Sequence, residues 1–382
     1  MGLRIVSKIG VVLSVILFMM AVGLYMFYEL DSTRKEQQVD LHTLVPDDCL
    51  GILETDNIHY YFSEFTTLNY NEEMINLPSS GLFGKMILSL HDVMQNRAHG
   101  LSSRTRAMLV SFHGSMEKLE QVMYMKVGPS DRKFLEEFLS DKIERSYTPK
   151  KEKYRGEVIY VYPLHNQHFL SVYMEDAYVV ASYEKRLVEK VIDAVKDKTS
   201  ITEDQVFKEA AQRTKANNHL TLYLKAAPMV SLRQSGNWTE FDVHVNSDVL
   251  YLTGETYGET DSQMLGFIDD LKLNGEICSD SILLTTRPAC LDSCIREKQL
   301  IQLDGKVAPN LFESSVANLS KDASFSFVGD VDCIMRNPKR YEEYMPRFLM
   351  YNAKAFCSFI VSSQLFVHEG HVSHIIVLTY KK

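Results

Sequence analysis

Hydrophobic residues form one unbroken run near the start of the chain and shorter alternating or helical patterns after it. The run from Ile9 to Tyr28 contains twenty residues without a charge. As an α-helix, a run of this length crosses the hydrocarbon core of a bilayer, which is about 30 Å thick. No small-residue cleavage pattern follows it before the charged cluster at residues 29–36, and the first cysteine is Cys49. We therefore expect a retained anchor that contacts the lipid bilayer, rather than a cleaved signal peptide or a lipoprotein leader.

Basic residues flank both ends of this run, so they bias the orientation only slightly. Arg4 and Lys8 precede it, and Arg34 and Lys35 follow it. An N-terminal signal anchor commonly sends the long segment after it across the membrane. We therefore expect a single-pass protein of the inner (cytoplasmic) membrane, with the bulk of the chain on the periplasmic side. The alternative is a cytoplasmic domain tethered by its N-terminus.

Beyond the anchor, strand-like and helix-like patterns follow one another. Residues 157–164, 169–176 and 177–183 are three strand candidates in close succession, and short loops between strands favour antiparallel pairing. Residues 184–198 then show helical spacing. The apolar stripe of this expected helix consists of Leu187, Val188, Val191, Ile192 and Val195.

The C-terminal part of the chain predicts hairpins. Residues 241–258 contain an expected turn at Asn246, Ser247 and Asp248. The last segment, residues 355–382, predicts strands joined by a tight turn at Glu369 and Gly370.

The order of two strands followed by an amphipathic helix recurs along the chain, which indicates a fold class and a domain plan. We expect an α+β fold: an N-terminal transmembrane helix, then mixed or mainly antiparallel sheets packed with amphipathic helices. Two similar halves are a further hypothesis, because the residue identities do not repeat closely. The expected parts are a cytoplasmic leader at 1–8, the anchor at 9–28, a linker at 29–43, a first half at 44–215 and a second half at 216–382.

Composition narrows the classes of partner. The formal net charge is −9, whereas proteins that bind nucleic acid usually present a basic face. We therefore expect no nucleic-acid partner. The apolar fraction of 45% is typical of a folded globule.

The six cysteines are even in number, as in an extracytoplasmic disulfide set, but they are widely spaced. Cys290 and Cys294 lie four residues apart in an expected helix start and would share one face. They are the candidate disulfide or thiol pair. A redox dithiol, a structural bridge and buried thiols all remain open for them.

Familiar catalytic motifs are absent from the sequence. There is no nucleophile elbow, phosphate-binding loop, dinucleotide fingerprint or zinc-protease helix motif. The metal-ligand candidates are two histidine pairs that flank expected turns, because facing imidazoles can bind zinc or copper. The pairs are His165 with His168 and His368 with His371. Solvated turn residues are the alternative interpretation, and we expect no cofactor.

Aromatic residues cluster after the first expected strand. As a group they would line a groove or fill the core, and core packing is the favoured interpretation. The cluster consists of Tyr60, Tyr61, Phe62, Phe65 and Tyr70. The single tryptophan, Trp238, lies at a loop-to-strand junction and is predicted to be an edge or core anchor.

Three segments carry a resemblance to a known group of proteins. They are LVPDDCLGILETDN at residues 44–57, YVVASYEKRLVEKVIDAV at 178–195 and HIIVLTYKK at 374–382. With the anchor, they resemble a family of uncharacterised membrane-anchored extracytoplasmic proteins of Gram-negative bacteria, known chiefly as a domain of unknown function. The resemblance implies an anchor followed by a large α+β domain outside the membrane, and it supplies no catalytic residues.

The sequence leaves two candidate functions. The first is a non-enzymatic membrane protein whose outer domain binds or scaffolds an envelope protein or polymer. The second is a membrane-tethered hydrolase or metal-dependent enzyme that acts on envelope polymers. The enzyme requires a concave pocket where histidines and carboxylates converge, whereas the binding protein requires an exposed apolar or aromatic surface.

Overall fold

The structure of the chain is a computed structural model. It describes residues 39–57, 67–70, 72, 107–115, 118–128, 135–136, 149–163, 169–212, 220–225, 237–258, 265–270, 277–279, 281–286, 310–341, 344–345, 349–350, 354–368 and 371–381.

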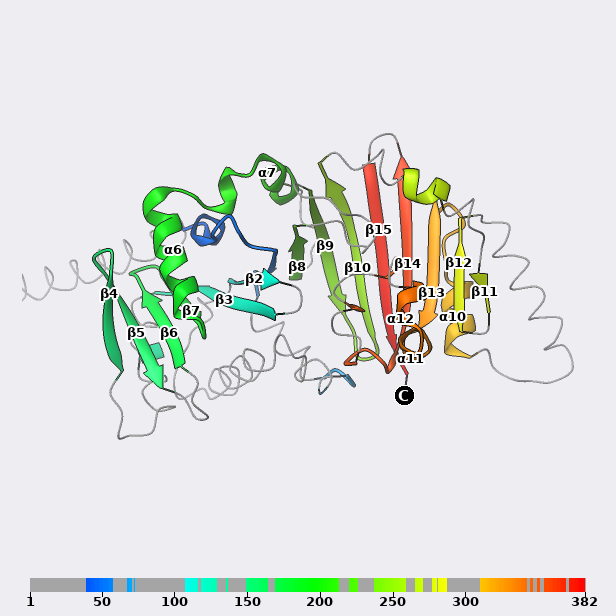
Figure 1. Cartoon of the computed structure of the whole chain (residues 1–382), viewed down its shortest axis with the longest axis horizontal. Coiled ribbons are helices and arrows are strands. Elements are labelled where there is room, and N and C mark those ends of the chain that lie inside the picture. Colours follow the sequence, from blue (N-terminus) through cyan, green and yellow to red (C-terminus); the bar gives the residue numbers. More distant parts are fainter. Residues whose placement is uncertain are drawn as a thin grey trace, which may run out of the picture.

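The described strands form one antiparallel sheet of 15 strands (Figure 1). The spatial order is β11-β12-β13-β14-β15-β10-β9-β8-β1-β2-β3-β7-β6-β5-β4. In chain order the strands are β1 (Gly51–Thr55), β2 (Met108–Ser115), β3 (Lys118–Lys126), β4 (Lys150–Tyr154), β5 (Glu157–Pro163), β6 (Phe169–Met174), β7 (Tyr178–Ser182), β8 (Leu220–Leu224), β9 (Trp238–Val245), β10 (Val249–Tyr257), β11 (Ile277–Cys278), β12 (Ile282–Thr285), β13 (Phe325–Asp330), β14 (Phe359–His368) and β15 (His371–Tyr380).

The middle of the sheet is held by β1, which pairs with strands from both parts of the chain. Leu53 is the partner of Val110 in β2 and of Leu222 in β8. Both edges of β1 are therefore hydrogen-bonded, and strands from before and after residue 215 belong to the same sheet. The expected fold class, an α+β fold of mixed or mainly antiparallel sheets packed with amphipathic helices, is wrong: the described strands form one large antiparallel sheet with few helices. The physical reason is that pairing both edges of β1 satisfies backbone groups that two separate sheets would leave exposed.

Few described helices accompany this sheet, and most of them lie on one face, which we call face A. They are η1 (Leu41–Leu44), α6 (Lys185–Asp197), η4 (Ile201–Glu203), α7 (Gln205–Ala211) and α10 (Leu311–Ala317). Figure 1 shows α6 and α7 over one half of the sheet and α10 at the other end. On the opposite face, face B, the short helix α11 (Val331–Met335) buries Val331 and Ile334 in a core with Phe327, and α12 (Pro338–Tyr341) follows it.

The helix α6 forms where helical spacing predicted it. Four residues of its expected stripe, from Leu187 to Ile192, are buried and pack on Val122 and Tyr124 of β3. Val195 differs: it is 36% exposed, because it lies in the last turn beyond this contact. The helix ends at Lys198, which is left-handed with φ 56° and closes the last turn by donating its N–H to the Ala194 carbonyl.

Trp238 of β9 connects the sheet to α7 on face A. The indole is fully buried and packs edge-to-face on Phe207 of α7, with ring centroids 4.9 Å apart. Its Nε1 donates a hydrogen bond of 2.9 Å to Asp204, which also caps α7 by accepting from the N–H groups of Val206 and Phe207. The prediction that Trp238 is an anchor residue is confirmed.

Gly254 of β10 lies opposite Phe241 of β9, where the structure leaves no room for a side chain. A Cβ atom at this position would lie 1.9 Å from the Glu240 carbonyl oxygen and 2.7 Å from the Phe241 ring. We expect Gly254→Ala to lower the free energy of unfolding by about 2 kcal/mol, because backbone atoms must move to admit the methyl group. Chemical denaturation measures this. Gly266→Ala is the control, because a Cβ atom there meets nothing within 4 Å, and equal stability of the two variants would contradict the expectation.

The expected anchor, residues 9–28, lies outside the described residues. Among the helices that the structure does describe, none is both long enough and apolar enough to cross a membrane.

Candidate functional site

A buried serine, a histidine and an aspartate form a hydrogen-bonded series beside β1. Ser111 and His113 are two residues apart on β2, so their side chains leave the same face of the strand. The Ser111 Oγ lies 2.7 Å from His113 Nε2, and His113 Nδ1 lies 3.2 Å from Asp48 Oδ1. This order of groups is the one that serine hydrolases use to activate a nucleophile.

The neighbours of this series extend it in both directions. At its inner end, Ser111 Oγ lies 3.1 Å from the hydroxyl of Tyr124 on β3. At its outer end, Asp48 accepts a hydrogen bond from Lys190 of α6. The hydrogen bond with His113, supported by Lys190, holds the pKa of the Asp48 carboxyl well below its usual range.

Ser111 and His113 are buried, and this distinguishes the series from a working active site. Ser111 is 0% exposed and His113 is 1% exposed, so the hydroxyl is closed off from solvent. Burial also raises the pKa of the neighbouring Cys49 thiol to about 12, which keeps that sulfur protonated and unreactive. In this arrangement the three groups satisfy one another and join β2 and α6 to the segment before β1. The series is therefore a structural hydrogen-bond network that runs from the buried Ser111 to the exposed Asp48.

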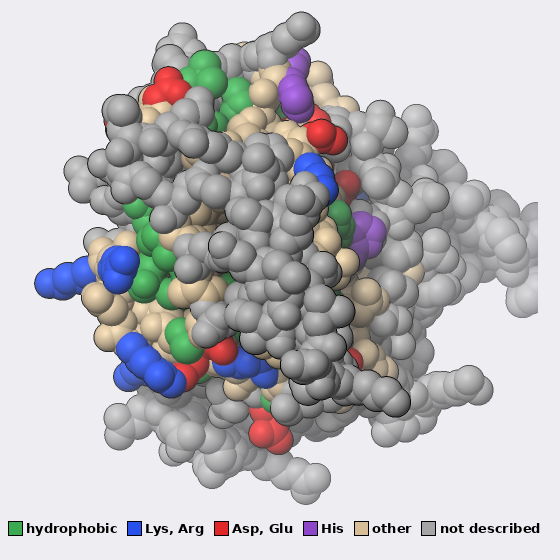
Figure 2. All heavy atoms as spheres, turned by 90° about the vertical axis from the view of Figure 1, so that its right-hand side faces the viewer, with side chains coloured by type: hydrophobic (Ala, Val, Ile, Leu, Met, Phe, Trp, Pro, Cys, Tyr) green, Lys and Arg blue, Asp and Glu red, His purple; other side chains and the backbone are tan. Residues whose placement is uncertain are grey.

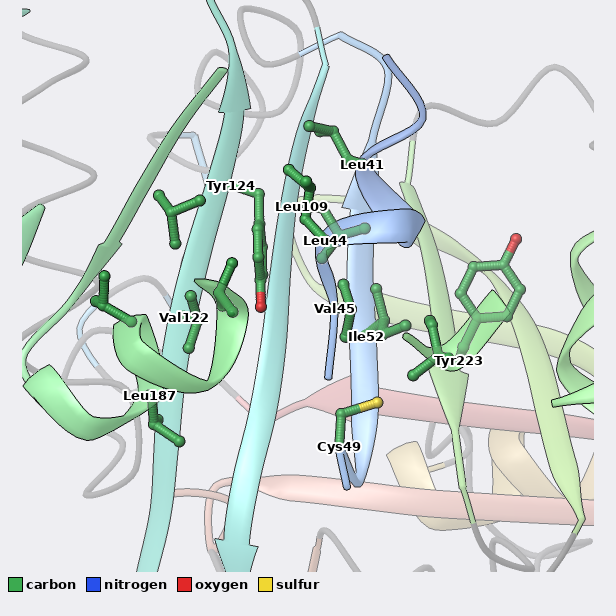
Figure 3. Close-up of a cluster of buried hydrophobic side chains, with 14 of the residues drawn as sticks. Leu41, Leu44, Val45, Cys49, Ile52, Leu109, Val122, Tyr124, Leu187 and Tyr223 are labelled. Atoms are coloured by element: carbon green, nitrogen blue, oxygen red, sulfur yellow. The ribbon is translucent and has the colours of Figure 1, made fainter. Parts of the chain in front are cut away.

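A second histidine, the half-buried His42, connects η1 to the sheet on face A. Its Nδ1 lies 3.0 Å from Asp40, and its Nε2 lies 3.4 Å from Glu54 on β1. The ring packs edge-to-face on Phe207 and Tyr223. Burial alone would lower the pKa of His42, but the two carboxylates outweigh it and raise the pKa to about 9. Figure 3 shows Leu44 of η1 and Val45, the residue after it, beside Ile52 of β1, and Leu41 of η1 belongs to the same buried cluster.

Alkaline pH should weaken this attachment. A free histidine has a pKa of about 6.5, so the stability that protonated His42 contributes is complete below pH 6.5 and is lost as the pH rises to about 9. We expect a loss of about 3 kcal/mol over this interval, from about 1.4 kcal/mol for each unit of pKa difference. Urea denaturation at pH 6.5 and pH 9.5 measures it. The His42→Gln variant should not show the loss, and a wild type that is equally stable at both pH values would contradict the assignment.

Between α7 and α10, two strands present a half-exposed surface on face A, which we call the open strip. It consists of the face-A side chains of β10 and β15: Val249, Tyr251, Thr253, Glu255, Ser373, Ile375, Val377 and Thr379. Helix α7 contacts β9 and β10, and α10 contacts β13 and β14. On face B of the same strands, Leu252, His374, Ile376 and Leu378 are buried. The strip therefore mixes apolar, hydroxyl and acidic groups within reach of solvent.

Two buried polar groups lie on the β9 side of the open strip: Asp242 is on the adjacent strand β9, and Tyr223 is on β8, one strand further away. Asp242 is the partner of Thr253 and of Thr221, and Tyr223 is the partner of Glu240, so all these side chains share face A. Asp242 is 6% exposed and Tyr223 is 0% exposed. Within the described part of the chain, neither the Oδ1 atom of Asp242 nor the Tyr223 hydroxyl has a hydrogen-bond partner. Figure 3 shows the Tyr223 hydroxyl directed away from the labelled hydrophobic side chains.

Only one of the predicted histidine pairs falls in the described structure. His368 and His371 are paired at the end of the β14–β15 ladder, which confirms the expected hairpin, and both are exposed. His165 and His168 lie outside the described residues. No group of three or more metal-ligating side chains occurs within the described part of the chain.

The predicted cysteine pair, Cys290 and Cys294, also lies outside the described residues. Three other cysteines, Cys49, Cys333 and Cys357, are free thiols. Of the aromatic cluster, Tyr70 is described: it is fully buried, packs edge-to-face on Phe359 and donates a hydrogen bond to the Asn246 carbonyl. The core interpretation is confirmed for this residue, and Tyr60, Tyr61, Phe62 and Phe65 lie outside the described part.

Comparison with protein families places one domain on the chain. Residues 115–247 match the family described as "Protein of unknown function (DUF3352)". The match runs from the end of β2 to the turn after β9, so it contains α6, α7 and the β9 residues beside the open strip. It does not include Asp48, Ser111 or His113. No curated protein matches the chain.

Among solved structures, two crystal forms of the protein TP0453 are similar in part. Crystal form III is 13% identical in sequence, with a TM-score of 0.31, and the alignment covers 58% of this chain and 80% of that one. Crystal form I is 10% identical, with a TM-score of 0.30, and the alignment covers 57% and 78%. Likenesses of this size carry no conclusion about fold or function.

Proposed function

We propose that this chain is a single-pass inner-membrane protein whose sheet domain lies on the periplasmic side and binds or scaffolds an envelope protein or polymer. The observation that carries the proposal is the open strip. There, Tyr251, Ile375 and Val377 are half-exposed on a sheet face whose neighbouring strands are covered by α7 and α10. Partly buried apolar and aromatic side chains that still reach solvent on a sheet face form a surface that a partner can cover.

The position of η1 supports an anchored domain. Asp40 already caps η1, and Leu41 is buried in the core. Eleven residues, 29–39, separate the apolar run from this point, and an extended chain of that length reaches at most about 40 Å. An anchor at residues 9–28 would therefore keep the sheet near the membrane surface, within reach of envelope components.

The distribution of charge supports a partner other than nucleic acid. Viewed from the β11 end of the sheet, Lys and Arg side chains in the described surface are interspersed with acidic and hydrophobic ones (Figure 2). Together with the net charge of −9, this favours a protein or neutral polymer as partner.

Crosslinking in membranes tests the binding function. The full-length chain, carrying a photoreactive amino acid at position 377 in the open strip, is irradiated in intact cells and purified with its adducts. We expect a discrete adduct, because a recognition surface is occupied in the envelope. The same amino acid at Asp322, an exposed residue outside the strip, is the control. Equal labelling of the same species from both positions, or none from position 377, would count against a binding surface here.

The hydrolase remains the alternative because Ser111, His113 and Asp48 are correctly ordered for it. We expect no reaction of the folded, full-length chain with a fluorophosphonate probe, because Ser111 is buried. Labelling is measured by gel fluorescence, with Ser111→Ala as the control. Labelling of the wild type that disappears in Ser111→Ala would show instead that Ser111 is a reactive nucleophile, as the hydrolase requires.

A further inference from the structure

The sheet ends in two edge strands, and β4 is the longer of them. Within the described residues, β4 pairs only with β5, and β11 pairs only with β12. Strand β11 contains two residues and β4 contains five, and Figure 1 shows them at opposite ends of the sheet. The outer side of an edge strand carries backbone N–H and C=O groups that can pair with a further strand.

The turn between β4 and β5 determines which backbone groups of β4 point outward. It consists of Arg155 and Gly156, both with positive φ, as in the two-residue turns that close β-hairpins. The two residues that flank such a turn form a hydrogen-bonded pair, and these pairs alternate with non-hydrogen-bonded pairs along an antiparallel ladder. Lys151 and Lys153 therefore occupy non-hydrogen-bonded pairs, so their N–H and C=O groups point away from β5.

The side chains of β4 differ in charge between the two faces of the sheet. On face A, Glu152 is paired with two lysines, one of which is Lys185 of α6. On face B, the side chains of Lys151 and Lys153 are exposed, and neither forms an ion pair within the described part of the chain. The Lys151 ammonium group lies 5.3 Å from the centroid of the Tyr160 ring. The outward backbone groups of β4 therefore belong to the two residues whose positive charge is not neutralised.

We propose that the outer edge of β4 binds an extended acidic segment of another protein, which adds to the sheet as an antiparallel strand. The outward N–H and C=O groups of Lys151 and Lys153 are complementary to a polypeptide backbone. Residues directly opposite these lysines lie on the same face, so aspartate or glutamate at alternate positions places a carboxylate beside each ammonium group. The position between them lies opposite Glu152, which already has its cations, so an uncharged residue suits it.

A second copy of β4 is a poor partner for this edge. Antiparallel pairing of two copies about Glu152 would place Lys151 of each copy opposite Lys153 of the other, and like charges directly opposite are destabilising. An acidic strand reverses this effect. On the N-terminal side the edge is limited by Pro149, which has no N–H group to donate, so the added segment is short. The site is separate from the open strip, and the inference therefore goes beyond the proposed function.

Peptide binding to the full-length chain, purified in a neutral detergent, tests this site. The probe is a fluorescein-labelled, N-acetylated peptide in which three glutamates alternate with threonines, and a matched peptide has lysine in place of glutamate. Two further probes are N-methylated, one on its glutamates and the other on its threonines. In the proposed register the glutamate N–H groups point to β4, so N-methylation there removes the pairing donors without changing the charge. Fluorescence anisotropy gives the Kd.

We expect saturable binding of the glutamate probe. N-methylation of its glutamates should weaken binding at least about tenfold, whereas N-methylation of its threonines should change it little. Replacing Lys151 and Lys153 together by glutamine should weaken binding about tenfold, and replacing both by arginine should preserve it. Lys339→Gln, which removes an exposed charge on α12, is the control and should have no effect.

Three results would overturn the inference: no saturable binding of the glutamate probe, equal binding of the lysine probe, or equal losses from the two N-methylated probes. Equal losses would show attraction between charges without addition of a strand. The photocrosslinking experiment at position 377 tests the open strip, so its result does not depend on the β4 edge.

Discussion

Replacing Trp238 with alanine is expected to lower the free energy of unfolding by about 4 kcal/mol, as is usual when a large buried aromatic side chain is removed. The indole is fully buried against Phe207 in the core on face A. The substitution also removes the donor to Asp204, the residue that caps α7. Because α7 covers β9, both the packing of the helix and its N-terminal hydrogen bonds depend on this side chain. Urea denaturation of the full-length chain in detergent measures the change.

Trp238→Phe separates the two contributions. Phenylalanine keeps an aromatic ring against Phe207 but has no N–H group for Asp204, so we expect a smaller loss, about 2 kcal/mol. Phe169→Ala is the matched control for an aromatic side chain, because Phe169 is exposed and its truncation should cost little. A Trp238→Ala variant that unfolds at the same urea concentration as Phe169→Ala would show that this core does not hold α7 on the sheet.

Acid is expected to destabilise the sheet through His374 on face B. The imidazole is fully buried, with Nε2 2.6 Å from the Thr256 hydroxyl, and its ring lies near Phe241. Its Nδ1 has no hydrogen-bond partner among the residues that the structure describes. Burial lowers the pKa of His374 to about 3, against about 6.5 in an unfolded chain. Below pH 6.5 this histidine therefore binds a proton in the unfolded state but stays neutral in the folded state. Stability should fall by about 4 kcal/mol between pH 6.5 and pH 3.5, at about 1.4 kcal/mol per pH unit.

The His374→Gln variant isolates this contribution. Glutamine does not titrate, and its amide can replace Nε2 as the partner of Thr256. Carboxylates such as Asp48, whose pKa is lowered in the fold, lose their own contribution in acid in both proteins. The difference in unfolding free energy between wild type and variant should therefore change with pH at the slope expected for one histidine. A difference that is constant from pH 6.5 to pH 3.5 would contradict the assignment.

Local structure was predictable from the sequence where a pattern involves neighbouring residues. The helical spacing at 184–198 identified α6, and the C-terminal hairpin was expected from its turn at Glu369 and Gly370. The fold class was not predictable in this way. Its decisive contact is the pairing of β1 with β8, which is separated from it by more than 160 residues, and alternation along a strand does not specify which distant strand pairs with it.

The candidate sites were also not predictable from local sequence patterns. Ser111 and His113 are visible in the sequence as polar residues two apart in a strand, but nothing near them points to Asp48. Asp242 alternates with Phe241 and Val243, a pattern that predicts an exposed aspartate on the far face. The structure does place it on the other face, yet that face is also covered, so Asp242 is buried. Burial by segments distant in sequence cannot be inferred from alternation alone.

The measurement that tests the account most directly is a protease-protection and cysteine-labelling assay on cells that express the full chain. A single-pass protein with a periplasmic sheet domain should be cleaved as soon as the outer membrane is permeabilised, while cytoplasmic markers stay protected. Thiol reagents should label Cys333 or Cys357 under the same conditions, since neither is fully buried. Protection of the whole domain until the inner membrane is broken would place it in the cytoplasm, and the proposed envelope function would then be wrong.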